Sequence, residues 1–237
     1  MIELLACLGA DVVVDERMNV QVTAAQLTNW KAPYELVKTM RASFLVLGPL
    51  LARHGSAEVS LPGGCAIGSR PVDQHLKGLQ AMGAAIEVVD GYVKAQAQQG
   101  LKGADIYMDL VTVGGTENLM MAACLAQGTT CLYNAACEPE IIDLGNFLAA
   151  LGARVSGYGT SEIVIEGRPE LGGCQYQIMS DRIEAGTYLI AAAITQGSIR
   201  LVDLQPAALG VILEKLQQMG AQIKTCLLYT SPSPRDS

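Results

Sequence analysis

The sequence predicts a mixed α/β protein in which helices cover sheets, because a helix–glycine–strand pattern recurs along the chain. In each copy, apolar residues at helical spacing end at a glycine, and a short β-type run follows that glycine. The glycines of the four copies are 74, 69 and 68 residues apart, which indicates a repeated supersecondary unit of about 70 residues. They are Gly9, Gly83, Gly152 and Gly220.

Each complete unit holds a second, alanine-rich helix before the helix that ends at the glycine. Residues 120–128 match residues 189–197, and residues 44–55 are a looser copy that contains a proline. A β-type run follows each of these helices, at 57–61, 129–133 and 198–202. Each unit is therefore predicted to run strand, helix, strand, helix and then a pair of strands.

The first and last units are expected to be incomplete. The chain begins inside the final helix of the first unit, so we expect that unit to lack its opening strand and first helix. The pattern of the fourth unit stops near residue 225. Residues 226–237 are rich in serine and proline, and we expect this tail to be foreign to the fold or disordered.

The second unit carries an insertion between its two helices. The helices end 28 residues apart in this unit, but 24 and 23 residues apart in the third and fourth units. The extra residues fall at 62–68. Since the sister units close without them, we expect this loop to lie on the working face of the protein.

The inserted loop places Cys65 directly after two glycines, with Arg70 and Asp73 close behind. Glycines let a ligand approach the backbone, and a guanidinium lowers the pKa of a thiol and binds phosphate or carboxylate. A reactive thiol beside an anion site is one interpretation. The alternatives are a buried structural cysteine and a surface ion pair between Arg70 and Asp73.

Composition narrows the class of function. Of the 237 residues, 50% are hydrophobic and 16% are charged, and the formal net charge is −7. This balance argues against a nucleic-acid surface, so an anionic substrate would meet only a few placed cations. No apolar run approaches the roughly 18 residues of a membrane span, so we expect no membrane contact.

The cysteines and the N-terminus predict a cytoplasmic protein. The seven cysteines form no CxxC pair and the chain has only two histidines, so we expect no metal and no cofactor. An odd, scattered set of cysteines is typical of a reducing compartment. The N-terminus has no signal-peptide pattern.

Five blocks of the sequence resemble the UDP-N-acetylglucosamine enolpyruvyl transferase family. They follow one another in order within residues 1–225, at 34–43, 61–73, 111–118, 134–140 and 181–187. The resemblance implies two inside-out α/β barrel-like domains of three repeats each, with the active site between them. It divides this chain into a Cys-loop domain at 1–179, holding about 2.5 repeats, the start of a second domain at 180–225, and the tail at 226–237.

The resemblance also implies a reaction. Enzymes of this family transfer the enolpyruvyl group of phosphoenolpyruvate to the 3′-hydroxyl of UDP-N-acetylglucosamine, the first committed step of peptidoglycan synthesis, and release phosphate. Cys65 matches the family's proton donor, which forms a covalent adduct with phosphoenolpyruvate and is the target of fosfomycin. We expect a monomeric whole protein, and no activity from this chain alone.

The remaining site residues follow from the same resemblance. Arg41 and Arg70 match contacts to the substrate anions, although Arg41 could also be a solvated charge on a helix. Leu110 stands where the family often has a lysine, and Cys137 where an arginine is common. The expected nucleotide-sugar contacts are Arg70, Pro71, Val72, Asp73, Gln74, Leu110, Val111, Thr112, Val113 and Gly114.

Two other functions remain open. One is an enzyme like 5-enolpyruvylshikimate-3-phosphate synthase, which shares the repeat architecture but is disfavoured by the Cys65 loop and the Arg-Pro-Val-Asp run. The other is a noncatalytic relative that binds nucleotide sugars, with which the loss of the lysine at Leu110 is compatible.

Overall fold

The structure is a computed structural model that describes residues 1–38, 40–62 and 72–225. It divides into two units, Met1–Tyr176 and Gln177–Ser237, and each is described by itself. Cys65, Arg70 and Pro71 lie outside the described residues.

Two four-stranded sheets in the first unit have the same topology. In each, the first strand pairs parallel with the second, and an antiparallel pair completes the sheet. The sheet orders are β3-β4-β6-β5 and β7-β8-β10-β9. The strands are β3 Lys31–Ala32, β4 Ser56–Ser60, β5 Ala85–Val89, β6 Tyr92–Gln96, β7 Asp105–Tyr107, β8 Thr129–Tyr133, β9 Arg154–Ser156 and β10 Glu162–Glu166.

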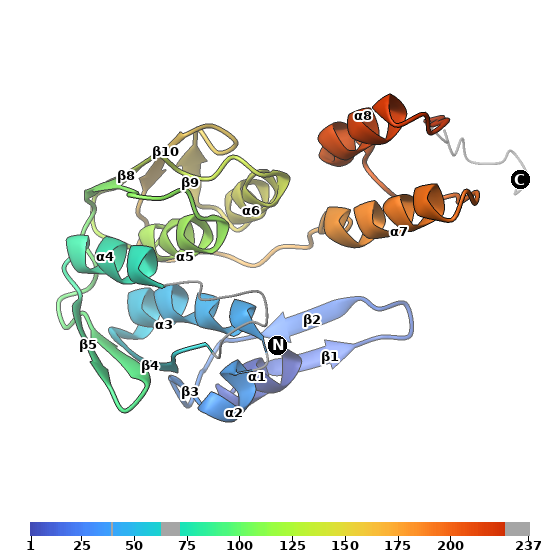
Figure 1. Ribbon diagram of the computed structural model, residues 1–237. Coiled ribbons are helices and arrows are strands. Elements are labelled where there is room, and N and C mark those ends of the chain that lie inside the picture. Colours follow the sequence, from blue (N-terminus) through green and yellow to red (C-terminus); the bar gives the residue numbers. More distant parts are fainter. Residues whose placement is uncertain (39, 63–71, 226–237) are drawn as a thin grey trace, which may run out of the picture. The chain divides into compact units, whose positions relative to one another are not determined.

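Two helices complete each of these repeats, so the predicted order of strands and helices is confirmed for both. The second repeat carries α3 (Leu47–His54) and α4 (Asp73–Ala81), preceded by α2 (Tyr34–Val37) and the 3-10 helix η1 (Arg41–Val46). The third carries α5 (Val113–Ala123) and α6 (Pro139–Ala150). Helix α5 packs against both α3 and α4, with the sheets to the outside of these helices (Figure 1).

In the first repeat, α1 (Ile2–Cys7) is followed by the antiparallel hairpin of β1 (Asp11–Val14) and β2 (Val20–Thr23). It has the helix and strand pair that the pattern predicts. Its core residues Leu4 and Leu8 are almost fully buried and belong to the same hydrophobic core as Leu47, Leu119 and Met120.

The repeated glycines end their helices as predicted. Their φ angles lie between +92° and +97°, in the region that side chains rarely adopt. At Gly83, Gly152 and Gly220 an added Cβ would meet nothing within 4 Å, so the backbone conformation and not crowding requires glycine there.

The second unit contains α7 (Arg182–Ile194), the 3-10 helix η2 (Pro206–Leu209) and α8 (Gly210–Gln218). The strand predicted at 198–202 is wrong, since the structure assigns no strand there. The equivalent strand β8 is held between β7 and β10, whereas no described residue forms a ladder with 198–202. In the part of the chain that the structure describes, no helix is long and apolar enough to cross a membrane.

Candidate substrate site

The two segments predicted to bind the nucleotide sugar meet at one edge of the first unit. Val72 is buried and is the N-cap of α4, and Asp73 and Gln74 begin that helix. Leu110, Val111 and Thr112 form the connection from β7 to α5, and Val113 and Gly114 begin α5. Leu110 and Val111 are exposed, so this connection presents apolar side chains to solvent.

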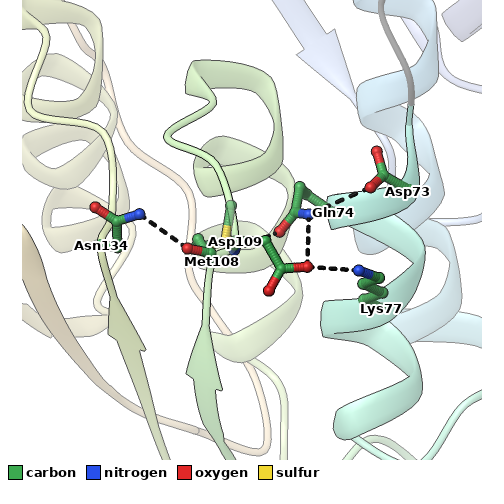
Figure 2. A network of polar contacts seen from close by, with 6 residues as sticks. All are labelled: Asp73, Gln74, Lys77, Met108, Asp109 and Asn134. Atoms are coloured by element: carbon green, nitrogen blue, oxygen red, sulfur yellow. Dashed lines mark hydrogen bonds and ion pairs between the residues drawn. The ribbon is translucent and has the colours of Figure 1, made fainter.

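A buried glutamine joins these segments (Figure 2). The backbone N–H of Asp109 donates to Gln74 Oε1 at 2.9 Å, and Gln74 Nε2 donates to Asp109 Oδ2 at 3.2 Å. Only 6% of Gln74 is exposed, so the amide end of these bonds is shielded from water. The residue immediately before the 110–114 segment is thereby fixed to the first turn of α4.

Lys77, one turn further along α4, also contacts Asp109. Its Nζ lies 2.5 Å from Asp109 Oδ2, and both side chains are more than half exposed. The hydrogen bond from Lys77, then that from Gln74, lowers the pKa of the Asp109 carboxyl, so Asp109 is an anion at neutral pH.

The other side of the 110–114 segment is held by the connection from β8 to α6. Asn134 Nδ2 donates to the carbonyl of Met108 at 2.8 Å, and Asn134 itself adopts a left-handed conformation with φ +58°. Thr112 is the N-cap of α5, because its Oγ1 accepts from the backbone N–H of Gly115 at 3.4 Å. Contacts on both sides therefore fix this edge (Figure 2).

His75 follows Gln74 on α4 and is buried, with only 4% of it exposed. Asn118 Oδ1 accepts from the backbone N–H of Gly48 at 2.7 Å, and Asn118 Nδ2 lies 3.0 Å from His75 Nδ1. The amide therefore donates to Nδ1, and the neutral ring carries its proton on Nε2.

Two candidate site residues act on the charge of His75, and a third, Gly114, packs beside its ring. Burial and then the charge of Arg41 lower the pKa of His75 to about 4, whereas Asp73 acts in the opposite direction. A Cβ on Gly114 would lie 3.5 Å from His75 Cε1. Arg41 is therefore within electrostatic range of this neutral imidazole, and Gly114 packs beside it.

Other titratable groups lie nearby. Burial and then the charges of Glu140 and Glu138 raise the pKa of Glu117 on α5. Among the described residues, no group of three His, Cys, Asp or Glu side chains could hold a metal ion.

Residues 1–230 match the family model for EPSP synthase (3-phosphoshikimate 1-carboxyvinyltransferase). The chain belongs to this family.

The chain is also similar to curated proteins of one enzyme name. It is 59% identical over 224 residues to a UDP-N-acetylglucosamine 1-carboxyvinyltransferase of Coxiella burnetii, and 60% identical over 223 residues to one of Saccharophagus degradans. Each match covers 94% of this chain but only 52% and 53% of the relative. The chain spans about half the length of the curated relatives it matches.

Solved structures confirm the fold of the family. The enolpyruvyl transferase NikO from Streptomyces tendae superposes with a TM-score of 0.77 at 22% identity, over 94% of this chain and 54% of that one. An EPSP synthase from Acinetobacter baumannii gives a TM-score of 0.70 at 22% identity, over 92% and 50%. The mixed α/β fold predicted from the repeats, and the enolpyruvyl transferase fold that the family resemblance implies, are therefore correct.

Sequence reasoning missed part of this edge. Asp109, Lys77 and Asn118 were not predicted as site residues, because their contacts join positions 32 to 70 residues apart. The available signal was position alone: Asp109 directly precedes the 110–114 segment, and Lys77 lies one helical turn after Asp73.

Proposed function

We propose that the whole protein to which this chain belongs transfers the enolpyruvyl group of phosphoenolpyruvate to the 3′-hydroxyl of UDP-N-acetylglucosamine. The observation that carries the proposal is the 59–60% identity to enzymes of that name over 94% of the chain. The solved 3-phosphoshikimate enzyme is only 22% identical. This contrast favours the nucleotide-sugar acceptor over a shikimate phosphate.

The reaction requires an addition and an elimination. The 3′-oxygen of the sugar forms a bond to C2 of phosphoenolpyruvate as the hydroxyl loses its proton and the C3 methylene gains one. The resulting tetrahedral intermediate then loses a proton from C3, and the bond from C2 to the phosphate oxygen breaks. We assign the proton donated to C3 to the Cys65 thiol. Arg41 and Arg70 hold the charges of the phosphate and carboxylate groups.

The described edge suits the nucleotide sugar. Residues 110–114 connect a strand to the N-terminus of α5, where free backbone N–H groups favour a diphosphate. The exposed side chains of Leu110 and Val111 offer an apolar surface beside it. Because position 110 is a leucine, the diphosphate has no lysine side chain there to attract it. The backbone N–H groups at the N-terminus of α5 supply the attraction instead.

The cellular setting follows from the same proposal. A nucleotide-sugar substrate for peptidoglycan synthesis is used in the cytoplasm. The five cysteines among the described residues are all free thiols, which supports a reducing compartment. We expect the whole protein to act as a monomer on its two small-molecule substrates, and this chain alone to be inactive.

The test is phosphate release by the whole protein with phosphoenolpyruvate and either of two acceptors. We expect release with UDP-N-acetylglucosamine and none with shikimate 3-phosphate. The reverse preference would favour the alternative enzyme, and binding of UDP-N-acetylglucosamine without phosphate release would favour the noncatalytic relative. Labelling of Cys65 by fosfomycin, located by peptide mass spectrometry, tests the assignment of the thiol separately.

A further inference from the structure

Both N–H donors of the Gln74 amide are used within the protein. Its Nε2 donates hydrogen bonds to Asp109 Oδ2 at 3.2 Å and to Asp73 Oδ2 at 3.3 Å, and its Oε1 accepts a hydrogen bond from the backbone N–H of Asp109. A primary amide has two N–H donors, so both are already used. The side chain of Gln74 therefore acts on the site through Asp109.

Asp109 is the point where these contacts converge. Its Oδ2 accepts from both Gln74 and Lys77, and its backbone N–H donates to Gln74 (Figure 2). One residue is thus held through its main chain and its side chain by helix α4. Met108, directly before it, is held from the opposite side by Asn134.

This arrangement sets the position of the segment that follows. Leu110 and Val111 are exposed, and the first fixed contact after them is the N-cap bond of Thr112. The path of this short segment therefore depends on how Asp109 is anchored at its start. The exposed ion pair between Lys77 and Asp109 is weak by itself. The buried Gln74 amide holds the same Asp109 carboxylate, and this gives the ion pair a defined geometry.

We propose that the side chains of Gln74, Lys77 and Asp109 are positioning groups that hold the 110–114 segment in its binding conformation and do not contact the nucleotide sugar themselves. For the side chain of Gln74, this replaces the direct contact that the family resemblance implies. The proposal rests on the proposed function for the identity of the ligand. It predicts that loss of the contacts weakens binding of UDP-N-acetylglucosamine and leaves the chemical step intact.

The test uses three variants of the whole protein. Gln74→Leu removes the amide at similar volume, Lys77→Met removes the charge, and Asp109→Asn keeps the shape of the side chain. We expect KM for UDP-N-acetylglucosamine to rise about fivefold or more in each, with kcat within about twofold. Lys77→Arg retains the cation and should restore the original KM.

A matched control comes from another exposed ion pair of the same unit. Arg154 on β9 and Glu166 on β10 lie 3.0 Å apart, and both are more than half exposed. Arg154→Met should leave KM unchanged. If Lys77→Met and Gln74→Leu match this control, the three residues have no positioning role.

A second measurement covers variants that fold poorly and separates the two proposals. Hydrogen exchange read by mass spectrometry should be faster at residues 109–115 in Lys77→Met and Asp109→Asn than in Arg154→Met. Unchanged exchange there would overturn the positioning role. Absence of phosphate release from the unmodified whole protein would instead overturn the proposed function, and with it the assignment of the ligand.

Discussion

Protonation of His75 should make the first unit lose stability as the pH falls from neutral to about 4. The pKa of this buried imidazole is lowered from 6.5 to about 4, chiefly by burial and secondarily by Arg41. In the unfolded chain the imidazole protonates near 6.5, whereas in the folded protein it stays neutral. The stabilisation is therefore complete above pH 6.5 and is lost progressively between 6.5 and about 4.

The size of the effect follows from the two pKa values. Each unit of difference corresponds to 1.36 kcal/mol, so the full change is about 3 kcal/mol. The assay is urea unfolding of the chain at several pH values from about 7.5 to about 4, a range that includes both pKa values of His75. Trp30, the single tryptophan, lies in the first unit and reports its unfolding by fluorescence.

The matched variant is His75→Asn. Its Oδ1 can accept the hydrogen bond that Asn118 donates to Nδ1, but the side chain does not titrate. The variant will be less stable at every pH because it leaves a cavity, so the comparison concerns the slope with pH. The unmodified chain should lose about 3 kcal/mol more than the variant over this range. Parallel curves would refute the account of His75.

Three further predictions concern packing, backbone conformation and thiol reactivity. Gly48→Ala on α3 should lower the free energy of unfolding by about 1–3 kcal/mol, because the added Cβ would lie 2.2 Å from Asn118 Oδ1. An unchanged free energy of unfolding in urea would contradict the close contact of α3 with α5. Gly152→Ala should cost about 1–2 kcal/mol through its φ of +95° alone, whereas Gly173→Ala, which also meets nothing within 4 Å and has no positive φ, should be nearly neutral. Equal losses for this pair would disprove the conformational explanation. Cys124 is buried, and burial raises its pKa to about 12. At pH 7 its thiolate is scarce, so Cys124 should resist iodoacetamide while the exposed Cys174 reacts. Mass spectrometry that finds Cys124 labelled in the folded chain would show that the end of α5 opens.

The fold could be predicted from the sequence where local chemistry decides the structure. A residue with φ near +95° just after a helix strongly favours glycine, and this preference recurs at Gly83 and Gly152 with the same helical pattern before it. The order of strands and helices in the second and third repeats followed from that recurrence. At 198–202 the same reasoning failed, because a strand also needs a partner from elsewhere in the chain.

The candidate site could be predicted only in part. The segments at 72–74 and 110–114 were found from their resemblance to a family, and the structure places them at one edge. The contacts that join them were not predictable. Lys77 and Asp109 are 32 residues apart, and Asn118 reaches Gly48 across 70 residues, so no local spacing reveals either pair.

The most direct test of the central claim is the mass of the product. The whole protein is incubated with phosphoenolpyruvate and UDP-N-acetylglucosamine, and the nucleotide sugar is recovered for mass spectrometry. The account predicts UDP-N-acetylglucosamine that carries one enolpyruvyl group on the 3′-oxygen, formed in equal amount to the released phosphate. Recovery of unmodified UDP-N-acetylglucosamine, from a protein that binds it, would contradict the claim.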